Sequence, residues 1–138
     1  GISNFMLHHM DALLETAKIV QMVNQIRLCP GDTKKETVDY CRAHNILVQA
    51  YSPLGTGRVF EVQELKDLAV KYETTVAKLC LRWSLQNGFL PLPKSVTPER
   101  IASNADIFGF NISEEDLQIM CDLEGRCGSS MDPDQRDF

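Results

Sequence analysis

The segment "ILVQAYSPLGTG", residues 46–57, indicates the class of fold. Its first part, residues 46–52, is almost continuously apolar, which is typical of a parallel strand covered on both faces. Pro53, Gly55 and Gly57 then predict a loop. Because parallel strands are joined by crossover connections that usually contain a helix, we expect helices before and after this strand.

Strand-like and helix-like segments alternate along the rest of the chain. Two more strands are expected over residues 22–28 and 89–92, each a short run of β-prone or apolar residues. The expected helices cover residues 6–17, 33–44, 62–72, 76–87, 98–104 and 114–123. This alternation predicts an α/β fold with a parallel sheet built from βαβ units. Three complete strands would leave two bare edges, so we expect the chain to be part of a larger architecture.

Several helix ends carry recognisable capping residues. Ser3 or Asn4 is expected to cap the first helix, Thr97 the helix at 98–104, and Ser113 the last helix. Thr33 is placed near the start of the helix at 33–44, and Gly88 is expected just past the end of the helix at 76–87.

Composition limits the possible partners of the chain. Its 138 residues, 43% hydrophobic and 24% charged, fit one ordinary globular domain. The net charge of -5 argues against a general surface for nucleic acid or anionic membranes. No run approaches the roughly 18 apolar residues that a membrane helix needs. Five cysteines without a C-x-x-C motif predict reduced thiols and a cytoplasmic location.

The sequence offers no convincing metal or catalytic set. His8 and His9 are adjacent, so on a helix they should point in different directions, and no metal site is expected. None of the familiar hydrolase, metalloprotease or P-loop motifs occurs. The acidic residues expected on helix exteriors, where they would be solvated or capping, are Glu64, Asp67, Glu73, Glu99, Glu114, Glu115 and Asp116.

Basic and hydroxyl side chains gather where the strand at 89–92 meets the helix at 98–104. Lys94 and Ser95 end the strand, and Thr97 and Arg100 lie at the helix start. Free N–H groups and the helix dipole attract anions there, so the pattern fits a phosphate site. A solvated helix start with incidental basic residues would give the same pattern.

Polar side chains also follow the other strands. Tyr51 and Ser52 end the strand at 46–52, where α/β proteins bind ligands, although a tyrosine that caps the core is an equal alternative. The "SNF" and "VNQ" segments add Ser3, Asn4 and Gln25. If these groups meet on one face, they indicate one extended polar ligand.

The motifs "GISNF", "VNQI", "VQAYSPLGTG", "LRWSLQNG", "LPKSVTPERI" and "FGFNISEEDL" occur in this order. Together they closely resemble the aldo-keto reductase family. The resemblance implies the C-terminal half of a (β/α)8 TIM barrel over residues 1–124, from the end of the fifth strand to the final helix. Residues 125–138 would form a C-terminal tail.

The resemblance also implies a site for NADP(H), bound in extended form without a Rossmann domain. Ser3, Asn4 and Gln25 would hold the nicotinamide carboxamide, and Tyr51 would stack on the nicotinamide ring. Along the pyrophosphate the implied residues are Ser52, Leu54 and Thr56. At the 2′-phosphate and adenosine they are Lys94, Ser95, Val96, Thr97, Arg100 and Asn104.

The chain departs from the family pattern in two ways. Arg27 and Cys29 stand where many members carry Glu and His, and Ser103 stands where an adenine contact is common. The family's catalytic residues precede the "SNF" segment, so none can be assigned here. We therefore expect the intact enzyme, with its N-terminal half, to reduce a small aldehyde or ketone with NADPH, and this chain alone to be inactive. The alternative is a non-catalytic NADP-binding half-barrel with a regulatory or interaction role.

Overall fold

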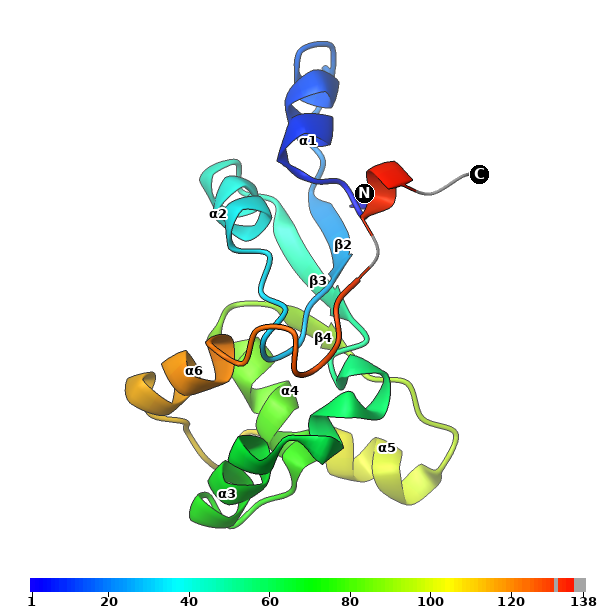
Figure 1. The fold of residues 1–138 in the computed structure, drawn as a ribbon. Coiled ribbons are helices and arrows are strands. Elements are labelled where there is room, and N and C mark those ends of the chain that lie inside the picture. The colour runs from blue at the N-terminus through cyan, green and yellow to red at the C-terminus, as the bar shows by residue number, and fades with distance from the viewer. Residues whose placement is uncertain (131, 136–138) are drawn as a thin grey trace.

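A computed structural model describes residues 1–130 and 132–135, and its centre is a parallel sheet (Figure 1). The strands are β1 (Ile2–Ser3), β2 (Val23–Arg27), β3 (Leu47–Tyr51) and β4 (Leu90–Leu92). They lie in the order β1-β2-β3-β4, and every neighbouring pair is parallel. The predicted alternation is therefore confirmed. The additional strand, β1, has only two residues, too few for any periodicity to reveal.

In the described ranges, six α-helices and two short 3-10 helices connect and follow the strands. The α-helices are α1 (Leu7–Leu14), α2 (Lys35–Ala43), α3 (Gln63–Lys71), α4 (Val76–Gln86), α5 (Pro98–Ala105) and α6 (Glu114–Cys121). The 3-10 helices are η1 (Gly55–Glu61) and η2 (Pro133–Gln135). From α6 the chain crosses back toward the N-terminus and α1 (Figure 1).

Two predicted helix starts are wrong. Neither Ser3 nor Asn4 caps α1, because Ser3 belongs to β1 and the cap position falls on Met6, which makes no side-chain cap bond. Helix α2 begins at Lys35, because Lys34 has a φ of 41°, in the left-handed region that ends helical backbone. Thr33 therefore lies outside the helix. The Ser113 cap is confirmed, with its hydroxyl accepting from the Asp116 amide.

Within the residues that the structure describes, the sheet is covered on one face only. Along β2 and β3, Asn24, Ile26, Val48 and Ala50 are at most 3% exposed, whereas Leu47, on the opposite face, is 46% exposed. The prediction that this strand is covered on both faces is thus wrong for this chain. Right-handed crossovers between strands in sequential order place every helix on the same side, so the other face stays open.

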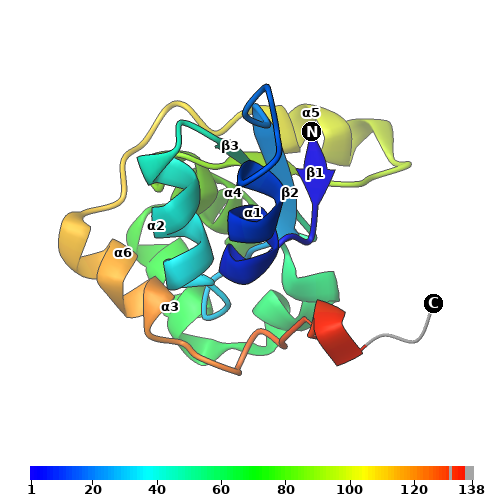
Figure 2. The same ribbon diagram turned by 90° about the horizontal axis from the view of Figure 1, so that it is seen from above.

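The hydrophobic core lies between the sheet and the helices. Its largest fully buried side chains include Met10 from α1, Ile26 from β2 and Trp83 from α4. Helices α1 and α2 pack side by side across this face (Figure 2). All five cysteines are free thiols, as predicted. No helix in the described part of the chain is long and apolar enough to cross a membrane.

Asp116, predicted on a solvated helix exterior, is instead 3% exposed. Its carboxylate lies 2.7 Å from Lys71 Nζ and accepts a hydrogen bond from the Tyr72 hydroxyl. The same hydroxyl accepts from the Ser113 amide at 2.9 Å. These bonds tie the end of α3 to the start of α6, because a buried carboxylate needs such partners to offset desolvation.

We expect Asp116→Asn to destabilise the protein and to reduce the dependence of its free energy of unfolding on pH. Lys71, and then Tyr72, hold the pKa of Asp116 below its usual value. The resulting stabilisation is present above the unfolded pKa of about 3.9 and is lost as the pH falls through the lower folded pKa. Urea unfolding should show a loss of about 1–3 kcal/mol at pH 7 that shrinks below about pH 4. Asp67→Asn, on exposed α3 surface, is the control, and equal losses at both pH values would contradict the assignment.

Candidate functional site

A cavity of about 570 Å³ lies at the carboxyl ends of β1 and β3. Five of its lining residues were predicted from the sequence: Ser3, Asn4, Tyr51, Ser52 and Thr56. Others were not predicted, and they are Phe5, Met6, His9, Arg27, Lys34, Ser130 and Pro133. The structure therefore brings Ser3 and Asn4 together with the predicted residues around the end of β3, although the two groups are far apart in the sequence.

Strand register explains this convergence. Ser3 pairs with Gln25, which pairs with Gln49, so these three residues lie at one level of the sheet. Tyr51 lies one pleat further along β3 and pairs with Arg27 on one side and Leu92 on the other. Because parallel strands end at the same edge, the residues after them must face a common site.

Amide side chains at this edge form a matched donor and acceptor pair. Asn4 Oδ1 accepts from the Tyr51 hydroxyl at 3.0 Å, and Gln25 Nε2 donates to Gln49 Oε1 at 3.1 Å. Within residues 1–130 and 132–135, Asn4 Nδ2 and Gln25 Oε1 make no hydrogen bond that competes with a ligand. A primary carboxamide needs one such donor and one such acceptor, so the residues present fit that group.

The cavity is lined by residues in strained backbone conformations. Among the described residues, six other than glycine have positive φ, and four of them, Asn4, Lys34, Ser52 and Thr56, line this cavity. A left-handed conformation costs a non-glycine residue about 1–2 kcal/mol, most clearly for a β-branched side chain such as Thr56. Such residues cluster at ligand sites, and this concentration marks the cavity as one.

The predicted phosphate residues lie on a different part of the surface. Lys94, Val96 and Arg100 are exposed, and in the described ranges Lys94 and Arg100 pair with no carboxylate. Thr97 is the cap residue of α5, but its side chain makes no cap bond, so the helix start keeps free N–H donors. Lys94 follows Leu92, the partner of Tyr51, so this cluster leaves the sheet at the same edge as the cavity.

Three predicted residues make other contacts. Leu54 packs against the hydrophobic core. Ser95 and Asn104 line a separate, apolar cavity of about 510 Å³, where Ser95 Oγ also accepts from the Thr97 amide at 3.2 Å. The structure therefore does not place these three in the 570 Å³ cavity.

Arg27 lines the cavity and is 7% exposed, and the sequence did not predict it as a site residue. It pairs with Asp32 and donates at 3.2 Å to the carbonyl oxygens of Cys127 and Gly128. Beside it, burial raises the pKa of the Cys29 thiol to about 12, so this cysteine stays protonated. No sequence signal links β2 to the tail, and the partners of Arg27 become visible only in the folded chain.

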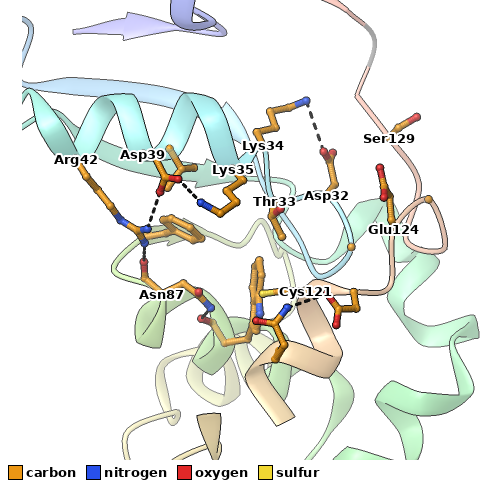
Figure 3. Close-up of a pocket in the computed structure, with 17 residues that line it drawn as sticks. Asp32, Thr33, Lys34, Lys35, Asp39, Arg42, Asn87, Cys121, Glu124 and Ser129 are labelled. Atoms are coloured by element: carbon orange, nitrogen blue, oxygen red, sulfur yellow. Dashed lines mark hydrogen bonds and ion pairs between the residues drawn. The ribbon is translucent and has the colours of Figure 1, made fainter. Parts of the chain in front are cut away.

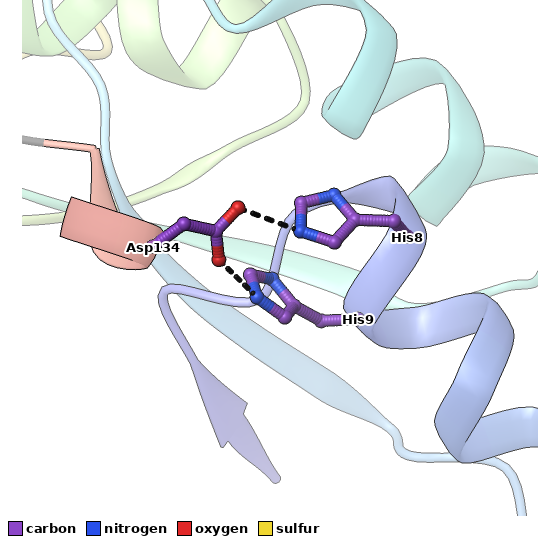
Figure 4. A group of neighbouring side chains, drawn as sticks. All are labelled: His8, His9 and Asp134. Atoms are coloured by element: carbon purple, nitrogen blue, oxygen red, sulfur yellow. Dashed lines mark hydrogen bonds and ion pairs between the residues drawn. The ribbon is translucent and has the colours of Figure 1, made fainter.

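His8 and His9 also behave differently from the prediction. Both rings reach the same carboxylate, with Nε2 atoms 2.8 and 2.7 Å from the two oxygens of Asp134 (Figure 4). The ring centroids are 3.9 Å apart. Adjacent residues in the first turn of a helix can converge in this way when their side chains bend toward one partner near the helix start.

A larger cavity of about 820 Å³ lies between α2, α4 and α6 (Figure 3). Its charged residues are mostly engaged with each other or with backbone. Lys35 pairs with Asp39, Lys34 Nζ lies 3.5 Å from Asp32, and Arg42 donates to the Asn87 carbonyl at 2.6 Å. We therefore take the 570 Å³ cavity, with the free amide nitrogen of Asn4 and its strained rim, as the candidate site. Gln25 does not line this cavity, but it pairs with Ser3, which does.

Parallel strands in sequential order, helices on one face and a cavity at the carboxyl edge define part of a (β/α) barrel. The chain belongs to the aldo/keto reductase family, whose sequence model matches residues 1–124. This confirms the predicted family and the predicted half-barrel fold.

Several known proteins are similar to the chain. A glyoxal reductase of Bacillus subtilis is 44% identical over 85% of the chain and 42% of its own length. The methylglyoxal reductase DkgA of Escherichia coli is 35% identical over 98% of the chain and 50% of its own length. Among solved structures, a Gox0644 mutant in complex with NADPH has a TM-score of 0.93 and 35% identity, covering 100% of this chain and 51% of that one. A Bombyx mori aldo-keto reductase in complex with NADP has a TM-score of 0.82 and 31% identity, over 91% of this chain and 44% of that one.

The chain thus spans about half the length of the relatives that it matches. The open face of the sheet is consistent with this, because a whole barrel encloses that face.

Proposed function

We propose that the complete protein is an NADPH-dependent reductase of small aldehydes or ketones. The observation that carries this proposal is the pair of available amide groups, Asn4 Nδ2 and Gln25 Oε1, beside Tyr51 at the carboxyl edge of the sheet. A nicotinamide ring presents one carboxamide and one flat face, and this edge offers partners for both. The relatives named glyoxal reductase and methylglyoxal reductase favour small dicarbonyl compounds as substrates.

Each part of the site has a role in binding NADP(H). Ser3, Asn4 and Gln25 hold the carboxamide, and the Tyr51 ring stacks on the nicotinamide, fixed by its hydrogen bond to Asn4. Ser52, Leu54 and Thr56 border the pyrophosphate. When bound, NADPH supplies the hydride that reduces the carbonyl carbon.

The basic cluster binds the adenosine end of the cofactor. Lys94 and Arg100 hold the 2′-phosphate together with the uncapped start of α5, while Ser95, Val96 and Thr97 contact the ribose side and Asn104 the adenine. Lys94 and Arg100 form ion pairs with the cofactor here only when the 2′-phosphate is present, so the cluster favours NADPH over NADH.

The proton donor comes from outside this chain. The described tyrosines have other tasks: Tyr51 bonds Asn4, Tyr72 bonds Asp116, and Tyr40 stacks on His44 at 4.1 Å. We propose that an N-terminal half-barrel covers the open face of the sheet and brings the catalytic residues. Residues 1–124 would then complete one barrel with it, followed by the tail at 125–138. The free thiols support a cytoplasmic location.

The decisive experiment compares the complete protein with the 138-residue chain, both purified and incubated with NADPH and methylglyoxal. We expect the complete protein to oxidise NADPH at a rate that saturates with methylglyoxal, and the chain alone to show no rate above buffer. Saturable NADPH binding without turnover by the complete protein would instead support a non-catalytic, regulatory or interaction role. Turnover by the chain alone would disprove the proposal that the catalytic residues come from outside this chain.

A further inference from the structure

The C-terminal strap, defined as residues 127–135 without the undescribed residue 131, forms one wall of the candidate site. Ser130 and Pro133 from the strap line the same cavity as Asn4 and Tyr51. The strap is held near its start by Arg27, which donates to the carbonyl oxygens of Cys127 and Gly128. At its far end it is held by the two histidines of α1 (Figure 4).

The tautomer of the neutral His9 ring follows from its hydrogen bonds. The Met6 amide donates to His9 Nδ1 at 3.0 Å, so Nδ1 carries the lone pair. The proton of the neutral ring therefore lies on Nε2, which donates to Asp134 at 2.7 Å. His9 is thus fixed between a donor in its own helix turn and an acceptor on the strap.

This arrangement argues against a metal ion among the three side chains. Two imidazoles and a carboxylate are a familiar ligand set for zinc, and here their ligand atoms lie within 4.8 Å of one another. A metal-bound histidine, however, donates its other N–H to an acceptor, whereas His9 Nδ1 faces a backbone N–H. The two histidines are therefore suited to hold the Asp134 carboxylate and not a metal ion.

We propose that His8, His9 and Asp134 form a clasp that holds the C-terminal strap against the site and so fixes the wall that contacts the carbonyl substrate. These residues are positioning residues, since they act through Ser130 and Pro133. His9 has the larger share, because its side chain is 29% exposed and itself lines the cavity, whereas His8 is 60% exposed. Asp132 supports the clasp, because its Oδ1 accepts from the Asp134 amide at 3.0 Å.

The two roles of His9 can be separated by substitution. In His9→Asn, the side-chain oxygen replaces Nδ1 and keeps the bond to the Met6 amide, but the side chain is too short to reach Asp134. In His9→Gln, the amide nitrogen replaces Nε2 and keeps a donor for Asp134 but loses the acceptor for Met6. A clasp predicts that Gln preserves the position of the strap and Asn does not. A purely local role in the α1 turn predicts the reverse.

The test follows amide hydrogen exchange of the strap in the complete protein by mass spectrometry, without substrate. We expect exchange in residues 132–135 to be about tenfold faster in Asp134→Ala and His9→Asn, and within twofold of the parent in His9→Gln. Asp67→Ala, an acidic residue on exposed α3 surface, is the control and should leave the strap unchanged. Equal exchange in all variants would overturn the proposal.

Two further measurements separate this proposal from others. If the complete protein is a reductase, on which this part rests, Asp134→Ala should raise KM for methylglyoxal about fivefold and leave kcat within twofold. Absence of activity in the parent would refute the proposed function, while the exchange result would still decide the clasp. Stoichiometric Zn²⁺ binding that is lost in Asp134→Ala would overturn the clasp in favour of a metal centre.

Discussion

Replacing Arg100 by alanine is expected to weaken NADPH binding by the complete protein about 10- to 100-fold. A charge-assisted hydrogen bond between a guanidinium and a phosphate contributes about 1.5–3 kcal/mol, and each 1.4 kcal/mol is a factor of ten in Kd. Arg100 is exposed beside the uncapped start of α5, so it is available to the phosphate. Lys94→Ala should act in the same direction, with a smaller effect because lysine cannot bind a phosphate in bidentate fashion.

If Arg100 and Lys94 bind the 2′-phosphate, their replacement should lower the affinity for NADPH much more than the affinity for NADH. The affinity for NADH, which lacks this phosphate, should change less than threefold in both variants when measured by fluorescence titration. Lys66→Ala, which removes an exposed lysine from α3, controls for the change in net charge. An equal loss of affinity for NADPH and NADH in Arg100→Ala would show that this residue serves some other purpose.

Replacing Gly31 by alanine is expected to destabilise the protein by about 3–5 kcal/mol, among the largest effects of a single substitution. Gly31 has a φ of +74°, and a Cβ atom there would lie 2.0 Å from the backbone oxygen of Leu123. Its amide also donates to the Met120 carbonyl at 3.0 Å. The turn after β2 therefore packs directly against the end of α6, and the added methyl group would force this turn and the helix end apart.

Gly88→Ala is a matched control for this clash. Gly88 has a φ of +75°, but a Cβ atom there would meet nothing within 4 Å. The control should lose only the cost of a left-handed alanine, about 1–2 kcal/mol. Urea unfolding of both variants of the complete protein measures the difference. Equal losses would mean that α6 moves aside freely and that its contact with Gly31 contributes little.

The alternation of elements could be predicted from the sequence because it rests on local signals, whereas the half-barrel was implied by the resemblance to the aldo-keto reductase family. The apolar run at residues 46–52 predicted β3, and Ser113 and Gly88 predicted helix ends through short-range hydrogen bonds. The convergence of Ser3, Asn4 and Tyr51 on one cavity also followed, because parallel strands carry their carboxyl ends to one edge.

What could not be predicted depends on contacts between distant segments. Asp116 looked like a helix-start carboxylate until α3 brought Lys71 and Tyr72 to it. Arg27 and His9 gained their partners from a tail whose sequence has no periodic pattern. The open face of the sheet also escaped prediction, because an apolar strand shows that both faces are suited to burial but not which segment covers them.

The strained residues around the site limit how this protein can be engineered for heat resistance. Asn4, Lys34, Ser52 and Thr56 each hold a backbone conformation that glycine adopts without cost. Together they represent several kcal/mol of the roughly 5–15 kcal/mol that keeps a domain folded. Relaxing them would raise the melting temperature but loosen the edge that receives the ligand. A thermostable variant should therefore be sought on the outer helices, with the loops after β1, β2 and β3 left as they are.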